Sequence, residues 1–579
     1  KRHNLEQINI MNKDGTLNSN AGKFVHLDRF DARKKIVQEL EEIGLLTKIE
    51  NYKHTIPFSD RGKVPIEPLL STQWFLKMEQ ISSQCLSKLE DENPNFVPSR
   101  WVKVYRDWLL NINDWCLSRQ LWWGHQIPAW YILKNSEVSI KGDTPYVIAH
   151  DEEEALQKAQ KEFGLDIKLI RDKDVLDTWF SSGLWPFSSL GWPNMESKDL
   201  QRWYPNSVLV TGFDIIFFWV ARMTMLGNAL TAKIPFNDVY IHGLVRDENN
   251  KKMSKSSGNG IDPLLLINKY GSDALRFALI REVAGAGQDI RLDYDRKAQT
   301  SSTVEASRNF ANKIWNATKF ALINCSQDSE VLNITYLKDD MELSDRWILS
   351  KVNKTKKKLY EFLRNYKLGE AAKLLYEFVW NDFCDWYVEF SKIRFNSSTK
   401  RNQTIPKRLL IDVLNDVFIM MNPFMPHISE ELWHALNGFS EDKLLSLQKW
   451  PSVSEIFLDN ALEQSFSEFF AIVRLIRNLR AELGLKPSQK IPIYLISSNN
   501  QLLNFIEALD EDIKILTKSS EVNFIKNKQI NEKIVAKSFS GIIGDLEVYL
   551  PFEGVINIDS LRDKLNKDLY KVNKEIETF

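Results

Sequence analysis

Residues 252–256 of this 579-residue chain have the sequence Lys-Met-Ser-Lys-Ser, in which Lys252 and Lys255 stand three positions apart. Two compact positive charges at this spacing on a short loop are suited to binding a polyphosphate. The next four residues, 257–260, are Ser-Gly-Asn-Gly and predict a flexible segment. Asp262 and the proline after it predict the cap and first turn of a helix, and helix N-termini also attract phosphate. The stretch therefore indicates chemistry on ATP.

The segments on either side of these lysines decide how much weight they carry. An isolated pair of lysines at this spacing is usually a solvated basic turn. Here residues 238–245 form an apolar run that predicts a short strand, and residues 270–277 predict the start of a second helix. A strand, a basic loop and a helix in this order favour a nucleotide site over a solvated turn.

Length and charge limit the class of protein. A chain of 579 residues is too long for one core, so several domains are expected. The net charge is −1, so a nucleic acid would have to bind local basic patches. No unbroken run of 18 apolar residues and no signal peptide is visible, which predicts a cytoplasmic protein without a membrane partner. The four cysteines are too scattered to predict a zinc site or a disulfide framework: Cys85, Cys116, Cys325 and Cys384.

Hydrophobic periodicity predicts a multidomain chain that is partly α/β and partly all-α. Residues 1–96 mix short apolar runs with turns, and residues 97–300 alternate strand-like and helical runs, which predicts a parallel sheet. Residues 301–490 show the spacing of long amphipathic helices, which predicts a helical bundle. Residues 491–555 predict a small α/β module, and residues 556–579 predict the start of a coiled coil. Within the bundle the expected helices cover 307–324, 343–365, 368–392, 407–421 and 429–437.

Tryptophan is concentrated in the α/β region. Eleven of the 18 tryptophans fall between Trp101 and Trp219, so this region holds many large, rigid side chains. We expect most of them to lie in the core and a few to line a pocket, because indole gives a wide apolar contact at low entropic cost.

Together with its flanks, the lysine stretch resembles the signature loop of the class I aminoacyl-tRNA synthetases. Segments 115–125, 177–187, 211–223 and 308–316 are similar to the valyl members of that family. The isoleucyl and leucyl members share the outline and remain an alternative. A tRNA-binding relative that has lost catalysis is a third possibility, against which the intact lysine loop argues.

This resemblance implies a two-step reaction, in which valine attacks ATP to form an adenylate and is then transferred to tRNA. Lys252 and Lys255 would act catalytically by stabilising charge on the phosphoryl oxygens, and Mg²⁺ would accompany ATP. The implied nucleotide-binding set is Lys252, Met253, Ser254, Lys255, Ser256, Gly212, Asp214 and His242. The implied valine-binding set is Trp179, Trp219 and Asp177. Arg474 and Arg477 are candidates for tRNA binding, as are the lysines between 354 and 358.

In fold, the same resemblance implies the second half of a Rossmann-type catalytic domain over residues 97–300, preceded by the remainder of an editing insertion. It makes residues 301–490 an anticodon-binding bundle, followed by a C-terminal module and the start of a tRNA-binding arm. The family's His-x-Gly-His motif does not occur in this sequence. We therefore expect this chain to be a piece of a longer enzyme and to be inactive by itself. The complete enzyme is expected to be a monomer that also hydrolyses the ester between tRNA and a threonine attached in error.

Overall fold

In the computed structural model the chain forms two compact units. The first comprises residues 1–95, 101–208 and 215–238, and the second comprises residues 96–100, 209–214 and 239–579. The structure describes residues 3, 5–6, 8–59, 62–69, 71–91, 93–133, 140, 142–165, 167–254, 257–283, 287–325, 340–396, 403–486, 488–526, 535–552 and 558–578.

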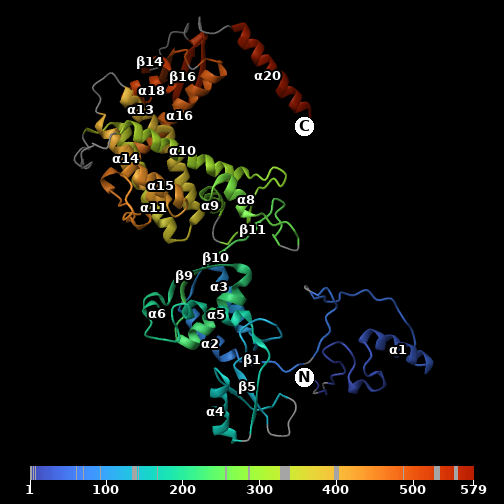
Figure 1. Cartoon of the computed structure of the whole chain (residues 1–579). Coiled ribbons are helices and arrows are strands. Elements are labelled where there is room, and N and C mark those ends of the chain that lie inside the picture. The colour runs from blue at the N-terminus through green and yellow to red at the C-terminus, as the bar shows by residue number, and fades with distance from the viewer. Residues whose placement is uncertain are drawn as a thin grey trace. The chain divides into compact units, whose positions relative to one another are not determined.

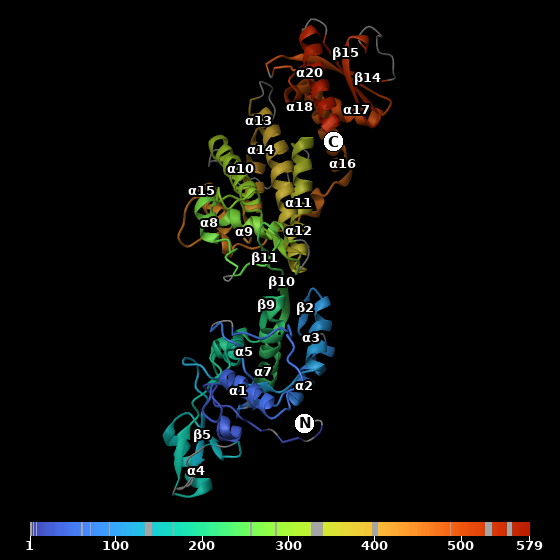
Figure 2. The same ribbon diagram turned by 90° about the vertical axis from the view of Figure 1, so that its right-hand side faces the viewer.

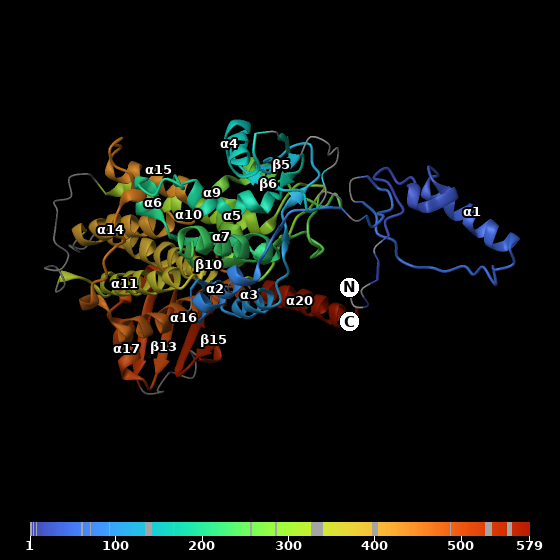
Figure 3. The same cartoon turned by 90° about the horizontal axis from the view of Figure 1, so that it is seen from below.

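Packed helices and several small sheets make up the described part of the first unit. Helix α5 (Thr178–Ser188) packs beside α7 (Ala221–Thr231), as Figure 3 shows, and α2 (Glu79–Glu90) packs on α7 as well. Strand β5 (Ala129–Leu133) lies between β6 (Tyr146–Ile148) and β7 (Lys168–Arg171), antiparallel to both, and α4 (Glu152–Phe163) packs on them. The described part of the first 110 residues also contains the 3₁₀-helix η1 (Ser19–Phe24) and the helices α1 (Arg29–Glu42) and α3 (Arg100–Leu110).

Two strands of one sheet end at residues that the sequence selects for nucleotide binding. Strands β2 (Asn95–Val97), β10 (Phe236–His242) and β9 (Asn206–Gly212) form a sheet in that order. The chain passes from β9 through a helical segment into β10, which confirms the predicted alternation of strands and helices. Beyond them, β11 (Val245–Arg246) pairs in parallel with β12 (Ile290–Arg291). The carboxyl ends of β9 and β10 therefore carry Gly212 and His242.

The predicted helix cap after the lysine loop is also confirmed. Helix α8 (Pro263–Tyr270) begins with its proline, and Asp262 accepts a hydrogen bond from the Leu264 amide at 2.9 Å. Helix α9 (Ser272–Arg281) follows at once, and the two helices share a small core that includes Leu266 and Ala274.

Long helices form the central part of the second unit, and α10, α11 and α14 run side by side in Figure 2. The expected helices are confirmed to within a few residues. The predicted helix 368–392 is one continuous run that contains a π-helical stretch at Phe378–Tyr387. The bounds are α10 (Ser302–Asn324), α11 (Leu343–Arg364), α12 (Leu368–Glu377), α13 (Val388–Asn396), α14 (Thr404–Met421), α15 (Pro426–Asn437) and α16 (Asn460–Glu482).

The described residues of the C-terminal segment form a four-stranded sheet that is accompanied by helices α17 and α18. Its strand order is β14-β13-β16-β15, and only the β13–β14 pair is parallel. Helix α20 extends away from this sheet in Figure 1, and its side chains Leu569, Val572 and Ile576 are exposed. The bounds are β13 (Ile491–Ser497), α17 (Asn500–Glu507), α18 (Asp510–Thr517), β14 (Ser519–Lys526), β15 (Ser538–Ile543), β16 (Leu546–Pro551) and α20 (Ile558–Thr578).

One helical segment of the described chain, Phe213–Thr231, is long and apolar enough by composition to cross a membrane. Half of it is buried inside the protein. A core helix has the same composition, and this segment connects two strands of one sheet.

Candidate active site

Gly212 ends strand β9 against two other predicted nucleotide-binding residues. A Cβ atom built on Gly212 would lie 2.9 Å from Oδ1 of Asp214 and 3.6 Å from Cε1 of His242. A larger residue would therefore push the carboxylate away. The His242 ring is held by its Nδ1, which lies 2.7 Å from the carbonyl oxygen of Gly243. The three predicted residues thus lie together in the second unit, and their arrangement depends on the absence of a side chain at position 212.

Lys252 lies beside this group. Its Nζ donates to Oδ2 of Asp214 at 3.1 Å, and 60% of the lysine side chain is exposed to solvent. The backbone of Lys252 is held by an antiparallel bridge to Arg246. An exposed pair of this kind is weak, so a triphosphate can draw the ammonium group away from the carboxylate. Lys255 and Ser256 lie outside the described residues.

Hydrogen bonds within the lysine loop hold its other predicted residues. The Ser254 hydroxyl lies 2.7 Å from that of Ser257 and accepts a bond from the Ser257 amide at 3.1 Å. The Ser254 amide donates to Oδ1 of Asn259 at 3.0 Å. Met253 is half-buried. Ser254 is therefore engaged in holding the loop, and the segment 257–260 is more restrained than its glycines predict.

Asp289 supports the strand that leads into the loop. Its carboxylate accepts hydrogen bonds from the Leu244 amide, at 2.8 Å, and from the Arg246 side chain. The bond from the Leu244 amide, helped by Arg246 and Lys252, holds the pKa of Asp289 below its ordinary value. This residue was not predicted from the sequence, because its partners are brought to it only by the parallel pairing of β11 with β12.

The predicted aromatic residues of the valine pocket lie in the first unit, on two packed helical segments. The Trp179 ring of α5 stacks on Phe218, with ring centroids 5.7 Å apart. The Trp219 ring stacks on Trp185 of α5, with centroids 5.9 Å apart. Trp179 and Trp219 thus belong to two stacks between the same segments, and each is fixed by its neighbour.

Asp177, the third predicted valine-binding residue, is occupied by the protein's own donors. It is 6% exposed, and its Oδ2 accepts from Nε1 of Trp115 at 3.0 Å and from Nη2 of Arg119 at 2.6 Å. Its Oδ1 caps α5 by accepting from the Trp179 amide at 3.2 Å. Asp177 therefore sets the position of Trp179, and a direct contact with valine is not needed to explain its burial.

A half-buried arginine, Arg222, completes the aromatic group. The Arg222 guanidinium lies 3.9 Å from the ring centroid of Trp115 and 5.3 Å from that of Trp108. Burial lowers the pKa of Arg222 to about 10, although the Asp177 carboxylate opposes the shift. The sequence reasoning missed Arg222 and Arg119. The only sequence feature that could have indicated them is that each arginine lies in a segment rich in aromatic residues, where cation–π stacking is common.

Two family models match this chain. The family model described as tRNA synthetases class I (I, L, M and V) matches residues 3–293, which is 291 of the 579 residues. The chain belongs to the class I tRNA synthetases. A second family model, the anticodon-binding domain of tRNA ligase, matches residues 345–495 of this synthetase chain.

The chain is 69% identical over 579 residues to a valine–tRNA ligase of Prochlorococcus marinus subsp. pastoris, and all of the chain aligns with 63% of that protein. It is 56% identical to a valine–tRNA ligase of Prochlorococcus marinus strain SARG, covering 62% of it. The synthetase chain thus spans a little under two thirds of these relatives. A Mycobacterium tuberculosis methionyl-tRNA synthetase structure gives a TM-score of 0.48 at 16% identity, covering 70% of this chain and 69% of the other.

Arg474 and Arg477, the candidates for tRNA binding, lie in the second unit within the anticodon-binding match. Both guanidinium groups lie over the Trp386 ring, 5.6 and 5.5 Å from its centroid. Arg477 also donates from Nε to the Leu516 carbonyl oxygen at 3.0 Å. Burial lowers the pKa of Arg477. Arg477 therefore joins α16 to α18, whereas Arg474 makes no such bond to α18 within the part of the chain that the structure describes.

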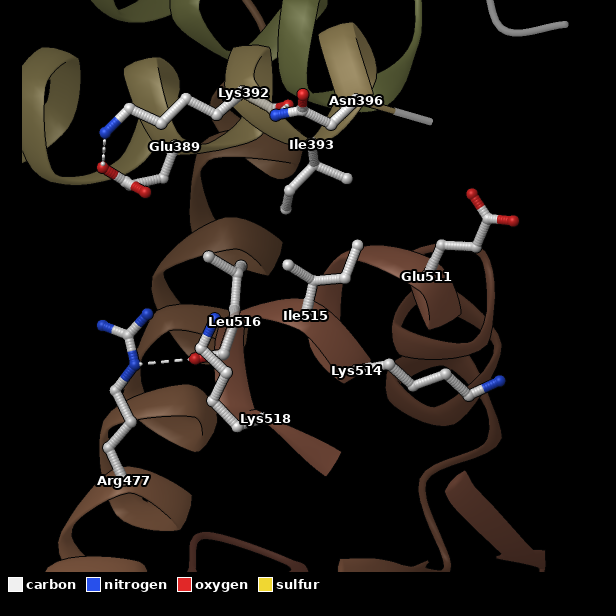
Figure 4. A pocket seen from close by; sticks show the side chains of 10 residues that line it. All are labelled: Glu389, Lys392, Ile393, Asn396, Arg477, Glu511, Lys514, Ile515, Leu516 and Lys518. Carbon is white, nitrogen blue, oxygen red and sulfur yellow. Dashed lines mark hydrogen bonds and ion pairs between the residues drawn. The ribbon is translucent and has the colours of Figure 1, made fainter. Parts of the chain in front are cut away.

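A cavity of about 580 Å³ lies beside Arg477, between α13, α16 and α18. Figure 4 shows the Lys392 side chain paired with Glu389 on one side and Lys518 near Leu516 on the other. The wall thus mixes both signs of charge. A second hollow of about 650 Å³ shares Glu389 and Arg477 with it and also includes Arg474.

The lysines between 354 and 358 are largely used within the bundle. Lys356 is buried and paired with Asp416, and Lys354 lies 3.0 Å from Glu463. A lysine held in this way has little free charge for phosphate. This cluster is therefore a weaker candidate for tRNA binding than Arg474.

Proposed function

We propose that this chain is part of an enzyme that attaches valine to tRNA through a valyl-adenylate. The observation that carries the proposal is the Lys252 ammonium group 3.1 Å from the Asp214 carboxylate at the end of β9, beside Gly212. The Lys252 ammonium group is suited to binding a triphosphate, and the neighbouring Asp214 carboxylate is suited to accepting hydrogen bonds from ribose hydroxyls. The identity of 69% to a protein named valine–tRNA ligase supports valine as the substrate.

In the proposed first step, a carboxylate oxygen of valine attacks the α-phosphorus of ATP, and the bond to the pyrophosphate leaving group breaks. In the second, a terminal ribose hydroxyl of tRNA attacks the carbonyl carbon and AMP leaves. Lys252 and Lys255 neutralise charge that develops on the phosphoryl oxygens, which accelerates the reaction because the charges are already in place. Mg²⁺ bound to ATP would supply further charge neutralisation.

Selection of valine falls to the aromatic stacks of Trp179 and Trp219. A rigid apolar wall excludes the larger isoleucine by shape, but it discriminates poorly against threonine, which has nearly the same shape as valine. Valyl-tRNA synthetases are the established example of this limit, with discrimination against threonine of only about 10². We therefore propose that the complete enzyme also hydrolyses threonyl-tRNA, with residues 1–96 as part of that editing insertion.

The test is amino-acid-dependent exchange of pyrophosphate into ATP, measured on the full-length protein that contains this chain. Valine should support exchange, with kcat/KM at least tenfold above that for isoleucine or leucine, because one methylene in an apolar pocket is worth about 10-fold or more. Preferred exchange with isoleucine or leucine would assign the protein to another member of the family. Absence of exchange with all three would favour the non-catalytic tRNA-binding alternative.

Binding of tRNA is proposed to involve Arg474, with Arg477 as its structural support. Phosphate contacts release counterions, so the affinity should fall as salt rises. Arg474→Ala should make this fall less steep by about one counterion, since one phosphate contact is lost. Filter binding over a range of salt concentrations measures the slope. An unchanged slope in Arg474→Ala would exclude this contact.

We also propose that the complete enzyme is a cytoplasmic monomer. Residues 97–300 would form the second half of its catalytic domain, 301–490 its anticodon-binding bundle and 491–555 its C-terminal module. The helix that follows would begin a tRNA-binding arm. Gel filtration with light scattering tests the monomer, and limited proteolysis tests the boundaries.

A further inference from the structure

A tight turn precedes the lysine loop and is organised by one buried carboxylate. Asp247 is 2% exposed, and its Oδ1 accepts from the Lys251 amide at 2.7 Å and from the Asn249 amide at 3.0 Å. These backbone bonds, together with the amide of Asn259, hold the pKa of Asp247 below its ordinary value. The turn delivers the chain directly to Lys252, whose backbone is bridged to Arg246.

The Asn259 side chain ties this turn to both parts of the lysine loop. Its Nδ2 donates to Oδ2 of Asp247 at 2.8 Å and to the Lys252 carbonyl oxygen at 3.2 Å. Its Oδ1 accepts from the Ser254 amide at 3.0 Å. An amide offers both donors and an acceptor, and all of these contacts use that dual character. One side chain thus fixes the backbone on both sides of Met253.

A second layer holds Asn259 in turn. Arg296 donates to both oxygens of Glu248, at 2.6 and 3.1 Å, and to the Asn259 carbonyl oxygen at 2.8 Å. The residue after Asp247 and the backbone of Asn259 are therefore bound to the same guanidinium group. A planar, forked donor of this kind restricts both segments more than a single bond does.

We propose that Asn259 is a positioning residue for adenylate formation, acting through Lys252 and the Asp247 turn. This inference rests on the proposed function. Lys252 has a long side chain that is 60% exposed, so the place of its ammonium group beside Asp214 depends on where its backbone is fixed. Asn259 supplies that fixed point. A loop anchored before ATP arrives loses less freedom when the transition state forms.

The experiment uses the full-length protein and valine-dependent pyrophosphate exchange. Asn259→Ala should lower kcat by about 10- to 100-fold, because misplacement of a charge by about 1 Å has effects of that size. The KM for valine and the melting temperature should stay close to those of the unsubstituted protein. Asn249→Ala is the matched control, since it removes an exposed asparagine side chain from the same turn and should leave kcat unchanged.

An exchanged pair separates positioning from general stability. Asn259→Asp should be worse than Asn259→Ala, because it sets a second carboxylate 2.8 Å from Asp247. Asp247→Asn combined with Asn259→Asp restores a donor opposite an acceptor, so kcat should recover by at least about tenfold over Asn259→Asp, in line with coupling between contacting residues.

Several outcomes would overturn the inference. Wild-type kcat in Asn259→Ala would do so. A fall in the kcat of Asn259→Ala that is matched by a fall in its melting temperature would also overturn it. The same holds if Asp247→Asn combined with Asn259→Asp restores the melting temperature but leaves kcat low. If the unsubstituted protein shows no exchange with valine, the proposed function fails and the inference fails with it. An active unsubstituted protein with an active Asn259→Ala variant refutes the inference alone.

Discussion

Two buried aspartates organise two groups of predicted site residues, one group in each unit, and they do so by different means. Asp247 in the second unit binds backbone amides and the Asn259 amide, which fixes a short polar loop. Asp177 in the first unit binds the Trp115 indole, the Arg119 guanidinium and the cap of α5, which fixes aromatic side chains. The polar loop depends on hydrogen bonds near solvent, whereas the aromatic group also depends on packing. We therefore expect substitutions in the loop to affect rate, and substitutions around Asp177 to affect stability and selectivity.

The largest effect expected on the loop side is that of Lys252→Ala. Loss of the ammonium group should lower the rate of valine-dependent pyrophosphate exchange by about 10²- to 10³-fold, as removal of one preorganised charge-stabilising group does elsewhere. The melting temperature should change little, because Lys252 is largely exposed and its pair with Asp214 is weak. Lys251→Ala is the matched control on the adjacent exposed lysine. A rate within twofold of the unsubstituted protein would remove Lys252 from the reaction.

On the aromatic side, Asp177→Ala should act on stability. It removes a helix cap, worth about 1 kcal/mol, and leaves the buried Trp115 N–H without its acceptor, at about 1–3 kcal/mol. The free energy of unfolding of the first unit should fall by about 2–4 kcal/mol in total. Chemical denaturation followed by tryptophan fluorescence measures it. Asp177→Asn should lose less, since its oxygen can still cap α5, and equal losses in the two variants would argue against the cap.

A smaller effect is expected on selectivity. Trp219→Ala removes one member of the stack with Trp185 and widens the wall, so kcat/KM for isoleucine relative to valine should rise by about tenfold. Pyrophosphate exchange with each amino acid gives the ratio. Trp203→Ala is the control, because Trp203 is an exposed tryptophan of the same unit. If this ratio changes equally in Trp219→Ala and Trp203→Ala, Trp219 contributes to packing but not to the selection of valine over isoleucine.

The same comparison separates what the sequence could predict from what it could not. The helices of the bundle follow from periodicity, and the cap at Asp262 follows from local side-chain chemistry, so both were predictable. The partners of the two aspartates were not. Asp177 meets Trp115 across 62 positions, and Asp247 meets Asn259 across 12, and no local pattern marks either pair. The glycines on either side of Asn259 predict a flexible loop, but the hydrogen bonds of Asn259 restrain it. Residue propensities contain no information about such tertiary hydrogen bonds.

The smallest effect concerns the dependence of stability on pH. Asp247 has a lowered pKa in the folded protein, so its ionised form contributes stability at pH values above the unfolded-state pKa of about 3.9. That contribution declines as the pH falls below about 4 and through the folded-state pKa. The difference in stability between the unsubstituted protein and Asp247→Asn should therefore be constant from pH 7 to about pH 5 and should narrow below about pH 4. Denaturation of both proteins across this range measures the difference. A gap that persists at the lowest pH would mean that the geometry of the Asp247 turn, rather than its charge, holds the loop.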